Sequence, residues 1–324
     1  MKRLFAILAA VAVTLSAAGC SAEENYAPPQ NAENASEASG AVTFTDALDR
    51  TVTVNNPEKA AALLGSFAEI WTLAGGQLAA APDDAWNDMD LPLSDDVLNL
   101  GKINDLSLET LLGSDPDFII ASSSVRVDLE WLDTIESTDI PIAYFDVSDF
   151  GDYLAMLKIC TDITGRADLY KQNGLDIKET VDSVIEKSRS RVEEKGAPEV
   201  LSLRVSASFV RAKSSQGNVL GKMLNTLGCI NIADGNEAFL EKISIEHIIE
   251  RDPDFIFVVQ SGDDKNGAQE TLDAFIADNP AWSSLTAVKE GRVYFMDKRL
   301  YNLKPNARWG EAYEKLEEIL NADL

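Results

Sequence analysis

Short apolar runs alternate with segments of helical apolar spacing along most of the chain. Residues 60–64 predict a buried strand, and residues 66–73 predict a helix that ends at Gly75 and Gly76. The same alternation returns later, with a strand at residues 200–205, a helix at 219–227 and a strand at 293–296. Alternating strands and helices favour an α/β fold built on mostly parallel sheets.

One segment occurs twice, 137 residues apart: residues 107–119 read SLETLLGSDPDFI and residues 244–256 read SIEHIIERDPDFI. Each copy has a Ser suited to cap a helix, an apolar pair one turn later, a Pro that ends the helix and an apolar strand beginning at Phe. The chain therefore uses one helix–strand unit twice, which favours two similar Rossmann-like lobes.

Residues 167–195 predict a single long helix between the two halves. Its apolar positions recur at helical spacing, at Ile177, Val181, Val184, Ile185, Ser188 and Val192. At 1.5 Å per residue it spans on the order of 40 Å before Gly196 and Pro198 end it. We expect an N-terminal lobe at 42–165, the linking helix at 166–196 and a C-terminal lobe at 197–324, with little flexing between the lobes.

The first residues predict secretion. Lys2 and Arg3 precede an apolar run at 4–15 that is too short to span a bilayer, and small residues then lead to Cys20. This resembles a lipoprotein signal peptide at 1–19 with Cys20 as the acylated residue, although Ala17 stands where that pattern prefers Leu. The alternative is an ordinary signal peptide with Cys20 as a spare thiol. Residues 20–41 are polar enough to predict a disordered tether.

Charge and cysteine usage narrow the set of partners. Without Lys2 and Arg3 the chain has 26 basic against 54 acidic side chains, which argues against nucleic acid and anionic lipid surfaces. Cys160 and Cys229 lie in different halves, and small buried hydrophobes explain both better than a disulfide.

Several segments together resemble the periplasmic binding protein family that serves iron-siderophore, haem and cobalamin importers. They are TDALDRTV at 45–52, LG at 100–101, both repeat units, LGCIN at 227–231 and LTAVKEGRVY at 285–294. The resemblance implies two Rossmann-like lobes on one spanning helix and delivery of solute to an ABC importer. The chain departs from the family at Asp49 and Cys229, where Gly is usual.

The resemblance also implies that the Glu of each repeat, Glu109 and Glu246, pairs with Arg on the permease. A dimeric permease offers two equivalent cationic pockets, which two similar lobes can fill. The alternative is that a Glu in the first turn of a helix only complements the helix dipole.

In open parallel sheets, ligands bind beyond the carboxyl ends of the strands. The candidates on loops after strands are Trp86, Lys102, Ser123 and Arg126 from the first lobe, and Phe209, Arg211, Phe239 and Tyr301 from the second. Aromatic walls and basic groups suit a bulky anionic chelate. Taken singly, each candidate is equally explained as a solvated cation or a core aromatic. Arg308, in the segment 304–310, is a further candidate for the cleft.

These observations predict an extracytoplasmic lipoprotein, tethered to the outer face of the cytoplasmic membrane, that binds a ferric siderophore-type chelate as a monomer without a cofactor. A free-metal receptor needs several imidazoles or clustered carboxylates at defined spacing, and His247 is the only His. We expect its ring to be solvated.

Three alternatives stay open. A cobalamin or haem receptor shares the same frame, and haem would use Met89, Met156, Met223 or Tyr301 as its ligand. A secreted enzyme is disfavoured because the catalytic motifs of hydrolases and phosphate-binding loops are absent from the sequence. A surface adhesin would bind no small molecule.

Overall fold

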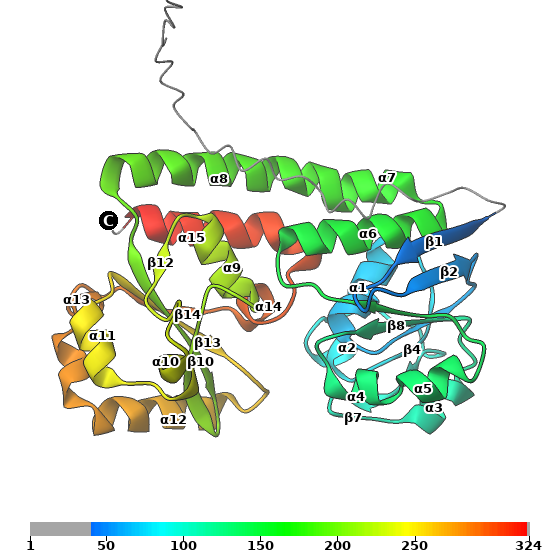
Figure 1. Ribbon diagram of the computed structural model, residues 1–324, viewed down its shortest axis with the longest axis horizontal. Helices are drawn as coiled ribbons and strands as arrows, with labels where there is room; N and C mark the ends of the chain where they lie inside the picture. Colours follow the sequence, from blue (N-terminus) through cyan, green and yellow to red (C-terminus); the bar gives the residue numbers. More distant parts are fainter. Residues whose placement is uncertain (1–39, 323–324) are drawn as a thin grey trace, which may run out of the picture.

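Residues 40–322 of the computed structural model are described here, and they form two α/β lobes spanned by a long helical rod (Figure 1). The predicted signal peptide, Cys20 and nearly all of the predicted tether lie outside the described residues. None of the helices within residues 40–322 combines the length and the hydropathy needed to cross a membrane.

The first lobe is built on a five-stranded parallel sheet in the order β5-β4-β3-β8-β9. Its strands are β3 (Ala60–Ala62), β4 (Leu78–Ala81), β5 (Leu98–Asn99), β8 (Phe118–Ser122) and β9 (Ile142–Phe145). The helices are α1 (Gly65–Leu73), α2 (Asp84–Asn87), α3 (Leu108–Gly113), α4 (Arg126–Glu130), α5 (Leu132–Glu136) and α6 (Phe150–Thr164). Two antiparallel pairs complete it, β1 (Ala41–Thr45) with β2 (Thr51–Asn55) and β6 (Gly101–Lys102) with β7 (Asp105–Leu106).

The second lobe has a five-stranded mixed sheet in the order β11-β10-β13-β14, with β12 also pairing with β10. Its strands are β10 (Glu199–Ser206), β11 (Phe209–Lys213), β12 (Ile230–Asn231), β13 (Phe255–Gln260) and β14 (Val293–Met296). Its helices are α9 (Val219–Thr226), α10 (Glu237–Glu241), α11 (Ile245–Arg251), α12 (Lys265–Asp278), α13 (Thr286–Lys289), α14 (Lys298–Tyr301) and α15 (Trp309–Ala322), with 3-10 turns η3 (Pro280–Ser284) and η4 (Asn306–Arg308). Only β11 runs antiparallel.

The duplicated segment has the same local structure in both lobes. Ser107 and Ser244 each cap a helix by accepting the backbone N–H three residues later. Just after the helices, Asp115 and Asp252 have φ of 49° and 41° ahead of the Pro. If β12 is taken as the partner of β4, the parallel strands also follow the same spatial order in both sheets. The repeat in the sequence is therefore a repeat in the fold.

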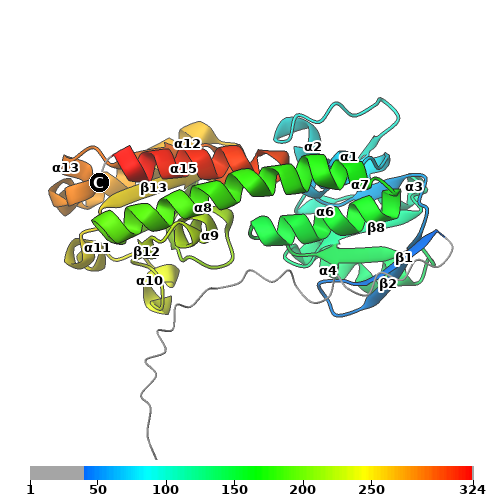
Figure 2. The same cartoon turned by 90° about the horizontal axis from the view of Figure 1, so that it is seen from above.

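The rod has the predicted extent but is not one regular helix. It consists of α7 (Ala167–Tyr170), a π-helical turn η2 (Lys171–Leu175) and α8 (Asp176–Lys195). At the wide turn the Tyr153 hydroxyl donates to the Asn173 carbonyl at 2.6 Å, and the Asn173 side chain donates to the Leu73 carbonyl at 2.8 Å. These bonds fasten the π turn to the first lobe. Figure 2 shows α15 lying along α8 over the second lobe.

The largest apolar cluster contains residues of both lobes and of the rod. At the junction, the rings of Phe150 on α6 and Trp309 on α15 have centroids 5.8 Å apart. The lobes are therefore joined by a shared core in addition to the rod. Cys160 and Cys229 are free thiols buried in this cluster, as predicted.

Candidate functional site

The edge of the first lobe that faces the second is formed by loops that follow the parallel strands. After β4, both carboxylate oxygens of Asp84 accept the Gly65 N–H at 3.1 Å. A Cβ at Gly65 would lie 2.6 Å from the Ala85 nitrogen, so only Gly permits this approach. Burial is the main reason that the pKa of Asp84 is raised to about 6.

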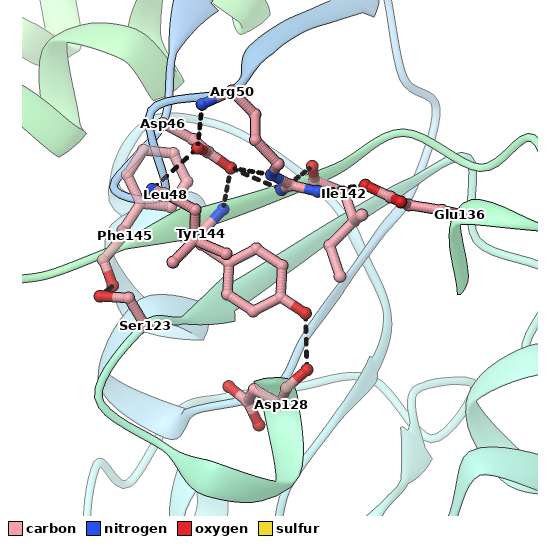
Figure 3. A network of polar contacts seen from close by, with 9 residues as sticks. All are labelled: Asp46, Leu48, Arg50, Ser123, Asp128, Glu136, Ile142, Tyr144 and Phe145. Atoms are coloured by element: carbon pink, nitrogen blue, oxygen red, sulfur yellow. Dashed lines mark hydrogen bonds and ion pairs between the residues drawn. The ribbon is translucent and has the colours of Figure 1, made fainter. Parts of the chain in front are cut away.

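A polar network fastens the β1–β2 hairpin to the edge strand of this lobe (Figure 3). The buried Asp46 carboxylate accepts the backbone N–H groups of Leu48 and Arg50 at 2.9 and 3.0 Å, and that of Tyr144 at 3.2 Å. The Arg50 guanidinium bonds Asp46 and, at 2.7 Å, Glu136 on α5. Asp49 has a φ of 58°, which explains why Gly is usual at this place in the turn. Cys229, the other departure, is absent from the residues of positive φ.

The same network holds the loop after β8. The Tyr144 hydroxyl donates to the Asp128 carbonyl at 2.5 Å, and the Ser123 N–H donates to the Phe145 carbonyl at 3.0 Å. The Asp128 side chain is fully buried; one oxygen accepts the Ser122 N–H at 2.8 Å and the other has no partner among the described residues. Burial raises the pKa of this carboxyl to about 7. The loop is therefore held rigidly at the lobe edge.

In the second lobe, the β10–β11 pair has one apolar face and one basic face. Leu201, Leu203 and Val205 point into a core cluster of this lobe. Because side chains alternate along a strand, Ser202 and Arg204 point to the other side. Arg204 pairs in register with Arg211, and Ser202 with Lys213, so three cations share that face. The Arg211 guanidinium also lies over the Phe209 ring, 4.7 Å from its centroid.

Lys304 brings a fourth cation into the same region, between the lobes. Its ammonium lies 6.0 Å from the centroid of the Phe67 ring in the first lobe. The pKa of Lys304 is lowered, mainly by burial. The charge of Asp146 in the first lobe raises this pKa, whereas the charge of Arg204 in the second lobe lowers it. Charges of both lobes thus act on this one ammonium group.

Arg204, Arg211, Lys213 and Lys304 form what we call the cleft cation cluster. None of the four makes an ion pair within residues 40–322, although acidic residues outnumber basic ones about two to one. The Arg204 Nε is buried and has no hydrogen-bond partner in that range. Burial lowers the pKa of Arg204, and burial together with the charges of Arg204 and Arg211 lowers that of Lys213. Such a cluster is suited to binding an anion that supplies the missing counter-charge.

A pocket of about 660 Å³ lies between α2 of the first lobe and the ends of β13 and β14 in the second. The Lys298 ammonium bridges the lobes there, bonding Asp88 at 2.8 Å and Asp263 at 2.9 Å. Nearby, Arg299 pairs with Glu69 of α1, and Asn306 donates to Glu69 and, at 2.9 Å, to the Ser66 carbonyl. These bonds fix residues 298–306 of the second lobe against the first.

The predicted ligand residues divide into two groups. Trp86, Lys102, Ser123, Phe209 and Arg211 are half-buried or exposed. The charge of Lys102 acts on Asp263 across the space between the lobes, lowering its pKa after the larger effect of Lys298. Arg126 is exposed on α4 and pairs with Glu130. Arg308 likewise pairs with Glu311, at 2.7 Å.

Phe239 and Tyr301 were expected in the pocket, and that expectation is wrong, because each is only 2% exposed. Phe239 packs in the core of the second lobe, and the Tyr301 hydroxyl donates to the Ala312 carbonyl at 2.9 Å. The expectation that His247 is solvated is also wrong: its Nε2 lies 3.0 Å from the Ile232 carbonyl, and its ring packs on Phe239 with centroids 4.7 Å apart.

The four candidate haem ligands are core residues. Met89, Met156 and Met223 are at most 6% exposed, and Tyr301 is equally buried. None of these side chains is available to a ligand in the arrangement described. Within residues 40–322 no group of three or more His, Cys, Asp or Glu side chains is placed to hold a metal ion.

Sequence reasoning missed three members of the cluster as ligand residues: Arg204, Lys213 and Lys304. A signal was present for two of them. Arg204 interrupts an otherwise apolar central strand, and Lys213 stands two residues after Arg211, on the same face of a strand. Lys304 gave no such signal, because its position depends on the packing of residues 298–306 against the first lobe.

The chain resembles two curated proteins over nearly the whole length of each. It is 24% identical to the iron-uptake system-binding protein of Bacillus subtilis (strain 168) over 324 residues, covering 98% of this chain and 96% of the relative. It is also 24% identical over 306 residues to the Fe(3+)-citrate-binding protein YfmC of the same strain, covering 92% and 90%.

Solved structures show the same fold at low sequence identity. Staphylococcus aureus SirA complexed with staphyloferrin B superimposes with a TM-score of 0.66 at 19% identity, covering 86% of this chain and 98% of SirA. The periplasmic vitamin B12 binding protein BtuF of Vibrio cholerae gives 0.65 at 17%, covering 82% and 97%. The periplasmic binding protein family matches residues 61–300, a span that includes both sheets and the rod between them. The chain therefore belongs to the periplasmic binding protein family.

Proposed function

We propose that this protein is the extracytoplasmic solute receptor of an ABC importer and that it binds an anionic ferric chelate between its lobes. The observation that carries the proposal is the cleft cation cluster, four basic side chains that make no ion pair within residues 40–322, in a chain of net charge −26. Carboxylate or catecholate oxygens of a ferric chelate would supply the counter-charge and accept hydrogen bonds from the guanidinium of Arg204. The names of the two curated relatives, both concerned with iron uptake, support the same solute class.

The surroundings of the cluster suit a bulky, partly apolar solute. Phe209 and Trp86 are half-buried aromatics on opposite lobes, one beside Arg211 and the other on α2. Flat rings of this kind pack against the organic part of a chelate while the cations bind its oxygens. The role is binding and delivery rather than catalysis, as in other periplasmic binding proteins.

Among the alternatives, a haem receptor is disfavoured because the four candidate axial ligands are core residues. A cobalamin receptor stays the second candidate, since the fold is that of a vitamin B12 binding protein. The cation cluster favours a solute with several anionic groups over one with few.

Delivery to the importer would use the duplicated acidic residues. Glu109 on α3 and Glu246 on α11 are both exposed, in different lobes. Two such carboxylates fit the two equivalent basic sites of a homodimeric permease. Acylation of Cys20 would keep the receptor, a monomer, at the outer face of the cytoplasmic membrane, within reach of that permease.

The proposal is tested by titration of the purified protein, with intrinsic Trp fluorescence as the readout. The solutes are ferric citrate, a ferric catecholate, a ferric hydroxamate, cobalamin and hemin. We expect saturable binding of an anionic ferric chelate, and loss of that binding in the double variant Arg204→Gln with Lys304→Gln. Binding of cobalamin alone, or of none of the five, would overturn the proposal.

Two further measurements address delivery and anchoring. Glu109→Arg with Glu246→Arg should abolish uptake by cells while chelate affinity is unchanged; a parallel loss of affinity would refute this division of roles. Replacement of Cys20 by Ala should release the protein from the membrane into the medium or periplasm.

A further inference from the structure

Each of the two exposed glutamates has an exposed aliphatic side chain one turn further along its helix. Leu112 follows Glu109 by three residues and is 37% exposed, and Ile249 follows Glu246 by three residues and is 39% exposed. Residues three apart lie on the same face of a helix. Leu112 and Ile249 also occupy the same position of the repeat, so both lobes present the same acidic–aliphatic pair.

The packing of helices α3 and α11 does not require an aliphatic side chain at position 112 or 249. The neighbouring positions already supply the core, because Leu111 and Ile248 are fully buried. Leu108 and Ile245 pack against the clusters from the helix starts. Leu112 and Ile249 belong to none of the apolar clusters of the described chain.

The coincidence of position matters more than the exposure. A single exposed Leu or Ile is ordinary on a protein surface. Within residues 40–322, however, only seven large hydrophobic side chains are exposed, and two of them fall at the same place of the duplicated unit, beside its Glu. If the exposure of Leu112 and of Ile249 were unrelated, we would not expect both residues to occupy the same position of the repeat.

The carboxylates beside them are held differently in the two copies. The pKa of Glu246 is lowered mainly by its own backbone N–H, and also by the hydrogen bond that its carboxylate accepts from the Ser244 hydroxyl at 2.8 Å. In the first copy the Ser107 hydroxyl is engaged by Thr110 instead, at 2.8 Å. Glu246 is therefore oriented by its own helix cap, whereas Glu109 lacks that bond.

We propose that each lobe docks on the permease through a two-part contact, in which Glu109 or Glu246 pairs with a basic group while Leu112 or Ile249 packs on an apolar surface beside it. The inference rests on the proposed receptor function and names a further part of its docking surface. Figure 1 shows α3 and α11 in different lobes, on either side of the molecule, so the partner must offer two separate sites. A permease of twofold symmetry would offer two equivalent sites, and the proposal requires each to hold a basic group next to an apolar patch.

The two parts of the contact would have different physical roles. The carboxylates steer the encounter and are screened by salt. The aliphatic side chains add affinity by leaving water, which salt does not screen. Docking should therefore keep part of its strength at high ionic strength, and that part should depend on Leu112 and Ile249.

The test uses the full-length protein and the importer permease of the same cell, reconstituted in lipid nanodiscs. Leu112→Ser with Ile249→Ser should weaken docking by roughly 25-fold, or about fivefold for each side chain. Leu175→Ser is the matched control, because Leu175 is 42% exposed but lies on the rod. Thermal unfolding and ferric citrate titration should be unchanged in both variants.

The glutamates serve as the reference. If the Ser double variant docks normally while Glu109→Gln with Glu246→Gln does not, the aliphatic part of the proposal is wrong and the receptor function stands. If neither pair of changes affects docking, the docking role of both helices fails, and the proposed delivery fails with it. Loss of docking in the Leu175→Ser control would show a general surface effect and would also overturn the inference.

Discussion

Arg204 on β10 lies directly opposite Arg211 on β11, and neither guanidinium has a carboxylate within ion-pairing distance in the part of the chain that the structure describes. Like charges placed opposite each other on an antiparallel pair are destabilising. Burial of Arg204, which lowers its pKa, adds to that cost. The repulsion between Arg204 and Arg211 therefore lowers the free energy of unfolding of the solute-free protein. An anionic solute bound between the two guanidinium groups would relieve this repulsion.

Arg204→Gln should separate stability from binding. We expect the free energy of unfolding of the solute-free protein to rise by about 1 kcal/mol, because the repulsion and the buried charge are removed. Affinity for the anionic chelate should fall about 10- to 100-fold, as for loss of a hydrogen bond to a charged group. Urea unfolding and fluorescence titration measure the two effects. Lys242→Gln, an exposed cation distant in sequence, is the control, and unchanged affinity in Arg204→Gln would contradict the assignment.

Asp128 should make stability depend on pH. Its pKa is raised to about 7 by burial, whereas an unfolded Asp titrates near 3.8. The folded protein therefore holds a proton that the unfolded chain releases, so the favourable contribution is present below pH 4 and is lost as pH rises through about 7. Asp128→Asn should be more stable than wild type at pH 8, by about 4 kcal/mol, with the difference vanishing near pH 4. Urea unfolding at both pH values tests this; a difference independent of pH would contradict it, and Asp133→Asn is the exposed control.

Asn306 should contribute both to stability and to the position of Lys304. It is fully buried, has a φ of 54°, and donates to Ser66 and Glu69 of the first lobe. Asn306→Ala should lower the free energy of unfolding by about 3 kcal/mol, since it loses those bonds and strains the backbone. Asn306→Gly should recover about 1 kcal/mol, because Gly tolerates the torsion. Equal losses in the two variants, measured by urea unfolding, would show that the torsion is irrelevant.

Solute binding should leave the arrangement of the lobes nearly unchanged. The shared apolar cluster and the interlobe bonds of Lys298 and Arg299 hold the lobes in one relationship. We expect the radius of gyration, measured by small-angle X-ray scattering, to change by less than about 1 Å on addition of a saturating ferric chelate. A larger contraction would indicate that the lobes hinge. Lys298→Met with Arg299→Met tests whether the interlobe bonds contribute to this rigidity.

The fold could be predicted from the sequence where one physical rule decided the outcome. The repeat, with its capping Ser and its Pro, gave two helix–strand units that the structure confirms at Ser107 and Ser244. The alternation of apolar strands and helices gave mostly parallel sheets. The π turn at Lys171–Leu175 could not be predicted, because bonds from Tyr153 and Asn173, made across the fold, stabilise it.

The site was predicted less well, for a physical reason. Phe209 and Arg211 were expected on a loop after a strand but lie on β11 itself, where the Arg211 guanidinium lies over the Phe209 ring. Phe239 and Tyr301 follow similar loops but turn into the core, and the sequence does not distinguish an aromatic wall from a core aromatic. Lys304 reaches the space between the lobes only because residues 298–306 fold back on the first lobe, which is a tertiary effect.

The wide turn in the rod determines how one half of the molecule is oriented about the other. Successive residues of an α-helix are offset by about 100° around the axis, and a π turn adds one residue to the winding. Before Lys171–Leu175 the rod lies on α6, and after it the rod lies on α15. Deleting a single residue there would restore regular winding but swing the far lobe by roughly a quarter of a revolution. Cleft residues of the two lobes would then no longer face each other, although every strand and helix could form unchanged.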